Sequence, residues 1–218
     1  FRQYDEFTRM GGVLNLAYKI NPNHKLLLRN TLTRDTDKEA REFSGEDNNQ
    51  GGIISSERTR WIERSLFSTG LAGDHALPRW KNLLAKWQFT YSTSSRNEPD
   101  LREVLRAKQD DGRWAYLNLG NSGQRFFNSF TDHIYEPQFE ISQPFFKGML
   151  TGAWSAGVRV TRRDRDFDAR RLRFQLQDPS QVNVYLSSNQ LFGPANLRPG
   201  VFELREETRG TDRYTATM

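Results

Sequence analysis

The chain has 218 residues, of which 35% are hydrophobic, 27% are charged and 12% are aromatic, and its formal net charge is +5. The absence of cysteine excludes disulfide scaffolds, cysteine-ligated zinc and thiol catalysis, and no run approaches the roughly 18 apolar residues that a membrane-spanning helix needs. Arginines alternate with carboxylates, as in TRRDRDFDARR, whereas a nucleic-acid binder would carry an unbroken basic patch with stacking aromatics.

Alternation of apolar and polar residues begins near the N-terminus and predicts two paired strands. Residues 11–20 place Leu14, Leu16 and Tyr18 on one face, and NPNH after them is typical of a turn. Residues 25–34 then run back with their leucines alternating with polar residues. The polar stretch 35–56 predicts an exposed loop, because it is too long for a tight hairpin and too hydrophilic to be buried.

The same unit repeats in the middle of the chain. Residues 58–73 predict a strand, residues 73–79 a short connection, and residues 82–92 a return strand. A second polar stretch, residues 96–124, predicts another long loop. The return strand has a continuous apolar face of Leu83, Ala85, Trp87, Phe89 and Tyr91.

A third unit follows. Residues 131–142 predict a strand in which Pro137 is tolerable near an edge or a bulge. QPFFKG reads as a turn, and residues 150–163 alternate again from Trp154 onward. The polar stretch 164–210 predicts a third long loop before one more strand begins at residue 211.

This rhythm predicts an all-β fold of about seven strands of roughly ten residues, with short turns on one side and long loops on the other. Strands of that length cross a bilayer at a tilt, and this asymmetry of turns and loops is typical of bacterial outer-membrane barrels. We expect an antiparallel up-and-down transmembrane β-barrel segment with long extracellular loops. The apolar residues of each alternating strand would face lipid, and the polar residues between them would face a wet lumen. Interfacial girdles would be formed by Trp80, Tyr91, Tyr135 and Trp154.

Several collinear stretches resemble the barrel of TonB-dependent outer-membrane receptors. They are LAYKINPNHKLLLRNTLTRDTDKEAREFSG, ERTRWIERSLFSTGLAGDH, SSRNEPDLRE, RFFNSFTDHIYEP and LFGPANLRPGVFELREETRGTDRYTATM, which together span most of the chain.

The resemblance implies a barrel of about 22 strands, plugged by a globular domain and driven from the inner membrane by TonB. It covers only a central part of that barrel, so residues 1–218 are expected to form a partial barrel domain without the plug, the TonB-binding segment or the closing strand. The chain starts at Phe1 and stops within an alternating pattern, which predicts a piece of a longer protein. The implied partners are outer-membrane lipid, a nutrient ligand and TonB.

Candidate ligand contacts are lumen-side or loop aromatics and charges, namely Trp114, Tyr116 and Arg125. The sequence carries no GxSxG, Walker or dinucleotide motif, so we expect no enzyme and no cofactor. His24, His75 and His133 lack ligand-like spacing, and we expect no metal.

Two carboxylate clusters have both a functional and a structural interpretation. DRDFD has the spacing that opens a calcium loop, but Ala169 replaces the required glycine and Gln175 the bidentate glutamate, which favours arginine–aspartate ion pairs on a loop. NEPDLRE places Glu98, Asp100 and Glu103 near a strand end, where anchoring by salt bridges is favoured over acid–base chemistry.

Two alternatives remain open. The first is a soluble secreted β-sandwich or a glycan-binding module with exposed aromatics. The second is a passive outer-membrane porin, which needs no plug.

Overall fold

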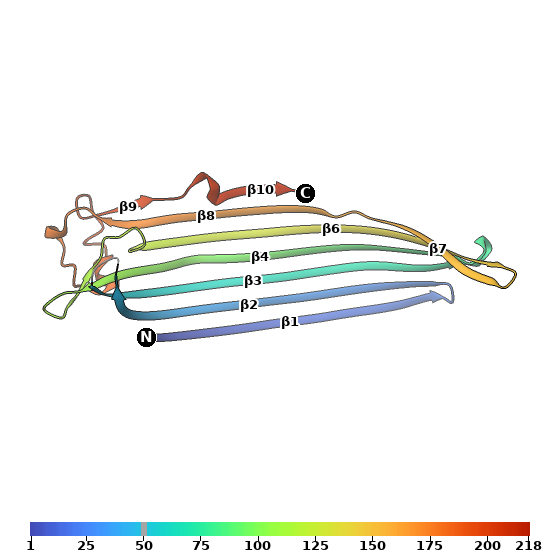
Figure 1. The fold of residues 1–218 in the computed structure, drawn as a ribbon, viewed down its shortest axis with the longest axis horizontal. Helices are drawn as coiled ribbons and strands as arrows, with labels where there is room; N and C mark the ends of the chain where they lie inside the picture. Colours follow the sequence, from blue (N-terminus) through green and yellow to red (C-terminus); the bar gives the residue numbers. More distant parts are fainter. Residues whose placement is uncertain (49–51) are drawn as a thin grey trace.

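The computed structural model describes residues 1–48 and 52–218, which form one antiparallel sheet of ten strands (Figure 1). Strands that follow one another in sequence also lie side by side in the sheet, in the order β1-β2-β3-β4-β6-β8-β10. The predicted all-β, antiparallel, up-and-down arrangement is therefore confirmed. Within the described part, β1 and β10 end this path, so the sheet has two unpaired edges.

The long strands are β1 (Arg2–Asn21), β2 (His24–Asp47), β3 (Gly52–Leu77), β4 (Leu83–Lys108), β6 (Gln124–Lys147), β7 (Leu150–Arg159) and β8 (Arg162–Leu176). The short strands are β5 (Trp114–Tyr116), β9 (Phe202–Glu206) and β10 (Arg213–Thr217). Four short helices complete the described chain: η1 (Pro78–Trp80), η2 (Pro179–Gln181), α1 (Ser188–Leu191) and η3 (Gly210–Asp212). No helix in residues 1–48 and 52–218 has the length and apolar content to cross a membrane.

Three tight connections lie together at one end of the sheet, here called the turn end (Figure 1). They are residues 22–23, residues 78–82 and residues 148–149. The sequence predicted all three, although β3 and β6 run several residues further than expected before they turn. The longer connections lie at the opposite end, here called the loop end (Figure 1).

The predicted bounds of the long loops were wrong, because much of each polar stretch belongs to a strand. Residues 35–47 continue β2, residues 52–56 begin β3, residues 96–108 continue β4, and residues 164–176 lie in β8; residues 49–51 of the first stretch lie outside the described residues. Ion pairs between strands hold these segments, such as Glu39 with Arg58 and Arg60. Opposite charges across a ladder stabilise a sheet that has water on both faces, so polarity alone did not indicate a loop.

Pro137 explains why one strand is divided into β7 and β8. Both pair with β6 in a continuous register, with Arg159 opposite Gln138 and Arg162 opposite Tyr135. Proline has no N–H to donate to the ladder, whereas the Val160 N–H still donates to the Pro137 carbonyl at 3.0 Å. The gap between β7 and β8 therefore reflects one missing backbone donor, that of Pro137 in β6, and β7 and β8 form one long strand.

A bulge interrupts β4 between Glu98 and Leu101, where the register shifts against β6, and the β3 register shifts near the same level. Pro99 lies in this bulge, where a residue is not required to donate an N–H to the ladder, and proline has no N–H to donate. Because a bulge adds a residue, side chains of β4 beyond it exchange faces. The bulge therefore changes which β4 side chains share a face at the loop end.

A small apolar core packs at the loop end rather than in the middle of the sheet. The segment between β8 and β9, which contains α1, folds against the strand ends there. Ser188 of α1 donates to the Glu57 carboxylate at 2.6 Å and accepts from Arg106 at 3.1 Å. The buried members of the core are Val104, Tyr116, Leu176, Leu191, Val201 and Phe202.

Replacing Leu191 by alanine should loosen this loop-end core. Leu191 is fully buried, and truncation of such a leucine costs about 2–5 kcal/mol. We expect limited proteolysis to cut residues 177–201 of Leu191→Ala at least tenfold faster than in the unmodified chain. Leu197→Ala, which removes a side chain that is 41% exposed, is the control; equal cleavage of both variants would contradict the packing described.

Candidate functional site

The register assigns every side chain of the long strands to one of two faces, because directly opposite residues in an antiparallel ladder point to the same side. One face carries Leu16, Leu28, Leu71 and Phe89, and we call it the belt face. The other carries Arg9, Arg64 and Arg96, and we call it the polar face.

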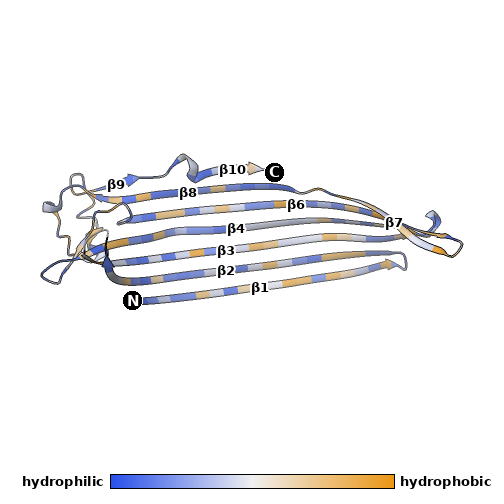
Figure 2. Cartoon of the chain, viewed as in Figure 1, coloured by the Kyte–Doolittle hydropathy of each residue, from blue (hydrophilic) through white to orange (hydrophobic). Residues whose placement is uncertain are grey.

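Apolar side chains on the belt face are aligned into rows that cross six strands. Most of these side chains are solvent-exposed, including Leu16 at 54%, Tyr18 at 67% and Val158 at 60%. The half of β1 nearest the turns is its more apolar half (Figure 2). Two successive rows and the rows that flank them are together called the belt. The first of the two rows is Leu16, Leu28, Leu71, Phe89, Pro137 and Val160, and the second is Tyr18, Leu26, Gly73, Trp87, Phe139 and Val158.

Hydrogen-bonded rings mark the turn-end side of the belt. The Trp87 Nε1–H donates to His75 Nε2 at 2.9 Å, and His75 Nδ1 lies 2.9 Å from His24 Nδ1. The indole lies across Gly73, where an added Cβ would come within 2.4 Å of Trp87 Nε1. Gly73 is therefore needed for this close approach, and the three rings place polar ring atoms beside the apolar rows.

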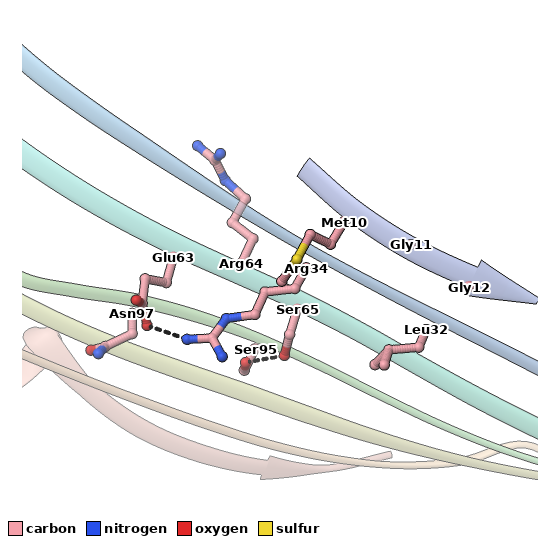
Figure 3. A pocket seen from close by; sticks show the side chains of 10 residues that line it. All are labelled: Met10, Gly11, Gly12, Leu32, Arg34, Glu63, Arg64, Ser65, Ser95 and Asn97. Carbon is pink, nitrogen blue, oxygen red and sulfur yellow. Dashed lines mark hydrogen bonds and ion pairs between the residues drawn. The ribbon is translucent and has the colours of Figure 1, made fainter. Parts of the chain in front are cut away.

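A second set of rings marks the loop-end side of the belt. The Tyr91 hydroxyl lies 2.9 Å from Nδ1 of His133, and the ring centroids of Tyr91 and Tyr135 are 5.1 Å apart. One row further, Arg34 pairs with Glu63 at 3.3 Å. Figure 3 shows this pair beside Leu32 and Met10 around a hollow of about 620 Å³. The belt face thus changes from apolar to charged within two rows.

The height of the belt follows from the register. On β3 the apolar side chains of this face extend from Leu77 to Phe67, a rise of ten residue steps, with Thr69 and His75 among them. At about 3.3 Å per residue this is roughly 33 Å along the strand, or about 25 Å along the normal of a layer crossed at a tilt of about 40°. The apolar band of a membrane barrel has about this height.

The polar face carries carboxylates that are each held by two arginines. Asp132 binds Arg163 and Arg165, with the Arg163 Nε at 2.9 Å. Asp35 lies between Arg9 at 3.3 Å and Arg64 at 3.8 Å. Figure 3 shows Arg64 directed away from the other side chains around the hollow, toward this opposite face. The Asp132 side chain is only 3% exposed although it is charged.

A comparable unit lies at the bulge of β4. The Asp100 carboxylate accepts from Arg125 at 2.8 and 3.0 Å and from Arg102 at 2.6 Å. Burial alone would raise the pKa of Asp100, but the hydrogen bonds from Arg125 and Arg102 outweigh it and hold this pKa below its usual value. The bulge is thus fixed by a carboxylate that stays ionised at neutral pH.

The three predicted ligand contacts all lie at the loop end but differ in exposure. Trp114 and Tyr116 form the ends of β5. Tyr116 is 6% exposed, its hydroxyl donates to the Phe174 carbonyl at 3.0 Å, and burial raises the pKa of its phenol. Arg125 lines a groove of about 520 Å³ beside α1. A role of these residues in ligand binding stays a prediction.

Both carboxylate clusters, DRDFD and NEPDLRE, lie in strands. Asp164, Asp166 and Asp168 alternate along β8. Asp168 pairs across the ladder with Arg213 at 2.6 Å, and Asp164 pairs with Arg162 of the same strand, so the expected ion pairs lie on strands and not on a loop. In β4, Glu98 pairs with Arg96, and Glu103 accepts from Ser56. In residues 1–48 and 52–218 no group of three or more acidic, histidine or cysteine residues is arranged to hold a metal ion.

Sequence reasoning missed the arginine–carboxylate–arginine units and the His24–His75–Trp87 group. Asp35 and Arg9 are 26 positions apart, and His24 and His75 are 51 apart. Only the strand register brings them together, and the one available signal was the repeated alternation of arginine with carboxylates.

Replacing Asp100 by asparagine should remove part of the pH dependence of stability. Because the pKa of Asp100 is lower in the folded chain, its stabilisation is present above about pH 4 and is lost as pH falls through the folded value. We expect Asp100→Asn to lower the free energy of unfolding at pH 7 by about 1 kcal/mol. Between pH 7 and pH 3, the free energy of unfolding of this variant should fall by less than that of the unmodified chain. Both quantities are measured by urea unfolding in detergent. Asp111→Asn, in an exposed pair with Arg113, is the control. Equal acid sensitivity of Asp100→Asn and the unmodified chain would refute the role of Asp100.

Comparison with known proteins gives no match to a protein-family model, to a curated protein or to a solved structure.

Proposed function

We propose that this chain is a segment of the transmembrane β-barrel of a TonB-dependent receptor in the bacterial outer membrane. In this proposal the belt contacts lipid, the polar face lines a wet lumen, and further strands pair with the two sheet edges. The loop end would lie outside the cell. Closure is required physically, because unpaired backbone N–H and C=O groups at a sheet edge are costly in hydrocarbon.

The belt is the observation that supports the proposal. Six strands place large apolar side chains in register on one face, and many of these remain about half exposed. A soluble β-sandwich would bury such a face under a second sheet, whereas the strands of the described residues form one layer. Contiguous exposed apolar surface of this kind is rare on soluble monomers.

The ring pairs at the two sides of the belt add support. Tryptophan, tyrosine and histidine have an apolar ring and a polar atom, which suits the boundary between hydrocarbon and headgroups. Trp87 lies toward the turn end and Tyr91 with Tyr135 toward the loop end. The outer rows of the two sets, that of His75 and that of His133, are eight residues apart along the strands, or about 20 Å along the normal of a layer crossed at about 40°. This separation approaches the height of an apolar band of about 25 Å.

The proposed activity is active uptake of a nutrient. The loop-end groove beside α1, which Arg125 lines, would take part in ligand capture, and the polar face would form part of the path. The energy would come from TonB, and no residue of this chain is assigned to that coupling. A passive porin shares the two faces, and uptake that persists without TonB would favour it.

Membrane insertion is tested by reconstituting the full chain from detergent into phosphatidylcholine vesicles. We expect an electrophoretic mobility that changes on heating, and quenching of tryptophan fluorescence by lipids brominated along their acyl chains. A chain that stays soluble without detergent and resists quenching would instead be a soluble sheet protein.

An arginine on the belt should oppose insertion, while an arginine one residue away should not. Leu28 and Leu27 are adjacent leucines of β2 on the belt face and the polar face respectively. An arginine facing lipid near the membrane centre costs about 2–4 kcal/mol. We expect Leu28→Arg to lose that much stability in vesicles and Leu27→Arg to lose less than about 1 kcal/mol, measured by urea unfolding. The same loss in both variants would refute the assignment of faces.

A further inference from the structure

We infer that the polar face binds a small water-soluble polyanion, one that carries two or more carboxylate or phosphate groups. The site is a cluster of five arginines, called the arginine patch: Arg9, Arg64, Arg96, Arg163 and Arg165. This inference rests on the proposed function, because it treats the polar face as the wall of a water-filled lumen.

The register brings the patch together from four strands. Arg9, Asp35, Arg64 and Arg96 are successive partners across β1, β2, β3 and β4. The same row continues through Phe130 and Phe167 of β6 and β8. Asp132 lies two residues further along β6, opposite Arg165. All of these side chains therefore share one face.

Each carboxylate of the patch is ion-paired to one or two of its arginines. The side chains of Asp35, Glu98 and Asp132 are 13%, 4% and 3% exposed. Their arginine partners are more open, with Arg64 42%, Arg96 40% and Arg163 38% exposed. A guanidinium has five N–H donors, and one or two bonds to a carboxylate leave others free. The buried carboxylates thus orient donors toward the open face.

The patch has more positive than negative charge. Five guanidinium groups face three carboxylates, which leaves an excess of two positive charges. In addition, Arg64 and Arg96 are directly opposite each other across β3 and β4. Like charges in this position destabilise a sheet, and an anion that bridges them would remove the repulsion.

The chemical class of the ligand follows from this geometry. Guanidinium forks bind carboxylate and phosphate oxygens in bidentate fashion. Neighbouring strands are about 4.8 Å apart and residues rise about 3.3 Å along a strand. Arg165 lies two residues along from the row of Arg96, so these two residues are separated by roughly 12 Å across β6. A solute that reaches both therefore needs anionic groups spaced over about 5–10 Å, which fits a tricarboxylate or a short polyphosphate.

The test is calorimetric titration of the full chain in detergent with tripolyphosphate and, separately, with citrate at low salt. We expect saturable binding that weakens steeply with added sodium chloride, and none with the neutral sugar maltotriose. Arg163→Gln should weaken binding about tenfold, the loss of a charge-assisted contact. Arg162→Gln is the matched control, because Arg162 precedes it in β8 but lies on the belt face and is 67% exposed.

Two results would overturn the inference: no binding of either anion by the unmodified chain, or equal weakening by Arg162→Gln and Arg163→Gln. If Arg163→Gln is misfolded by circular dichroism, Arg64→Gln takes its place with the same expectation. Binding that requires anionic lipid would identify a headgroup as the occupant and would also overturn the inference. Vesicle insertion is measured separately, so a chain that inserts without binding refutes only the polyanion site, and one that binds without inserting refutes only the membrane proposal.

Discussion

The structure depends on one constraint, which is that backbone hydrogen bonds between strands fix the register and the register fixes which face each side chain occupies. From Leu16 to Val160, six strands bring apolar residues into the same rows because every pairing keeps the same parity. A shift of one residue in any ladder would place that strand's apolar side chains among the arginines. The two faces are therefore a property of the whole sheet rather than of single strands.

The register also accounts for the low apolar content of the chain. Half of the strand positions point to the polar face, and the strands continue far beyond the belt, as in β3, which has 26 residues. A strand needs only about 9–11 residues to cross a bilayer. The remainder is held by ladder bonds and by pairs such as Glu39 with Arg58, which require no apolar core.

Much of the fold could be predicted from the sequence, because alternation with period two is local and the turns carry their own signals. The antiparallel up-and-down order and the three tight turns follow from these features. The strand extensions could not be predicted, since charged residues in a water-exposed ladder have the composition of a loop. At Pro137 the sequence predicted only that a proline would be tolerated, and it did not predict the break between β7 and β8 opposite this residue. The units around Asp35 and Asp132 depend on partners far apart in sequence, and no local pattern specifies them.

The two faces impose opposite requirements on the same backbone, and this links the belt to the arginine patch. A guanidinium on the belt face would lose its hydration in hydrocarbon, so arginines near the belt must point to the polar face or lie beyond the apolar rows. Arg34 and Glu63 satisfy the second condition, because they pair on the belt face one row past Leu32. Arg162 also satisfies it, because it lies on the belt face one row past Val160. Arg163 and Arg165 satisfy the first, and the parity of β8 then places them together on Asp132. Concentrating positive charge on the polar face is thus a direct consequence of excluding it from the belt.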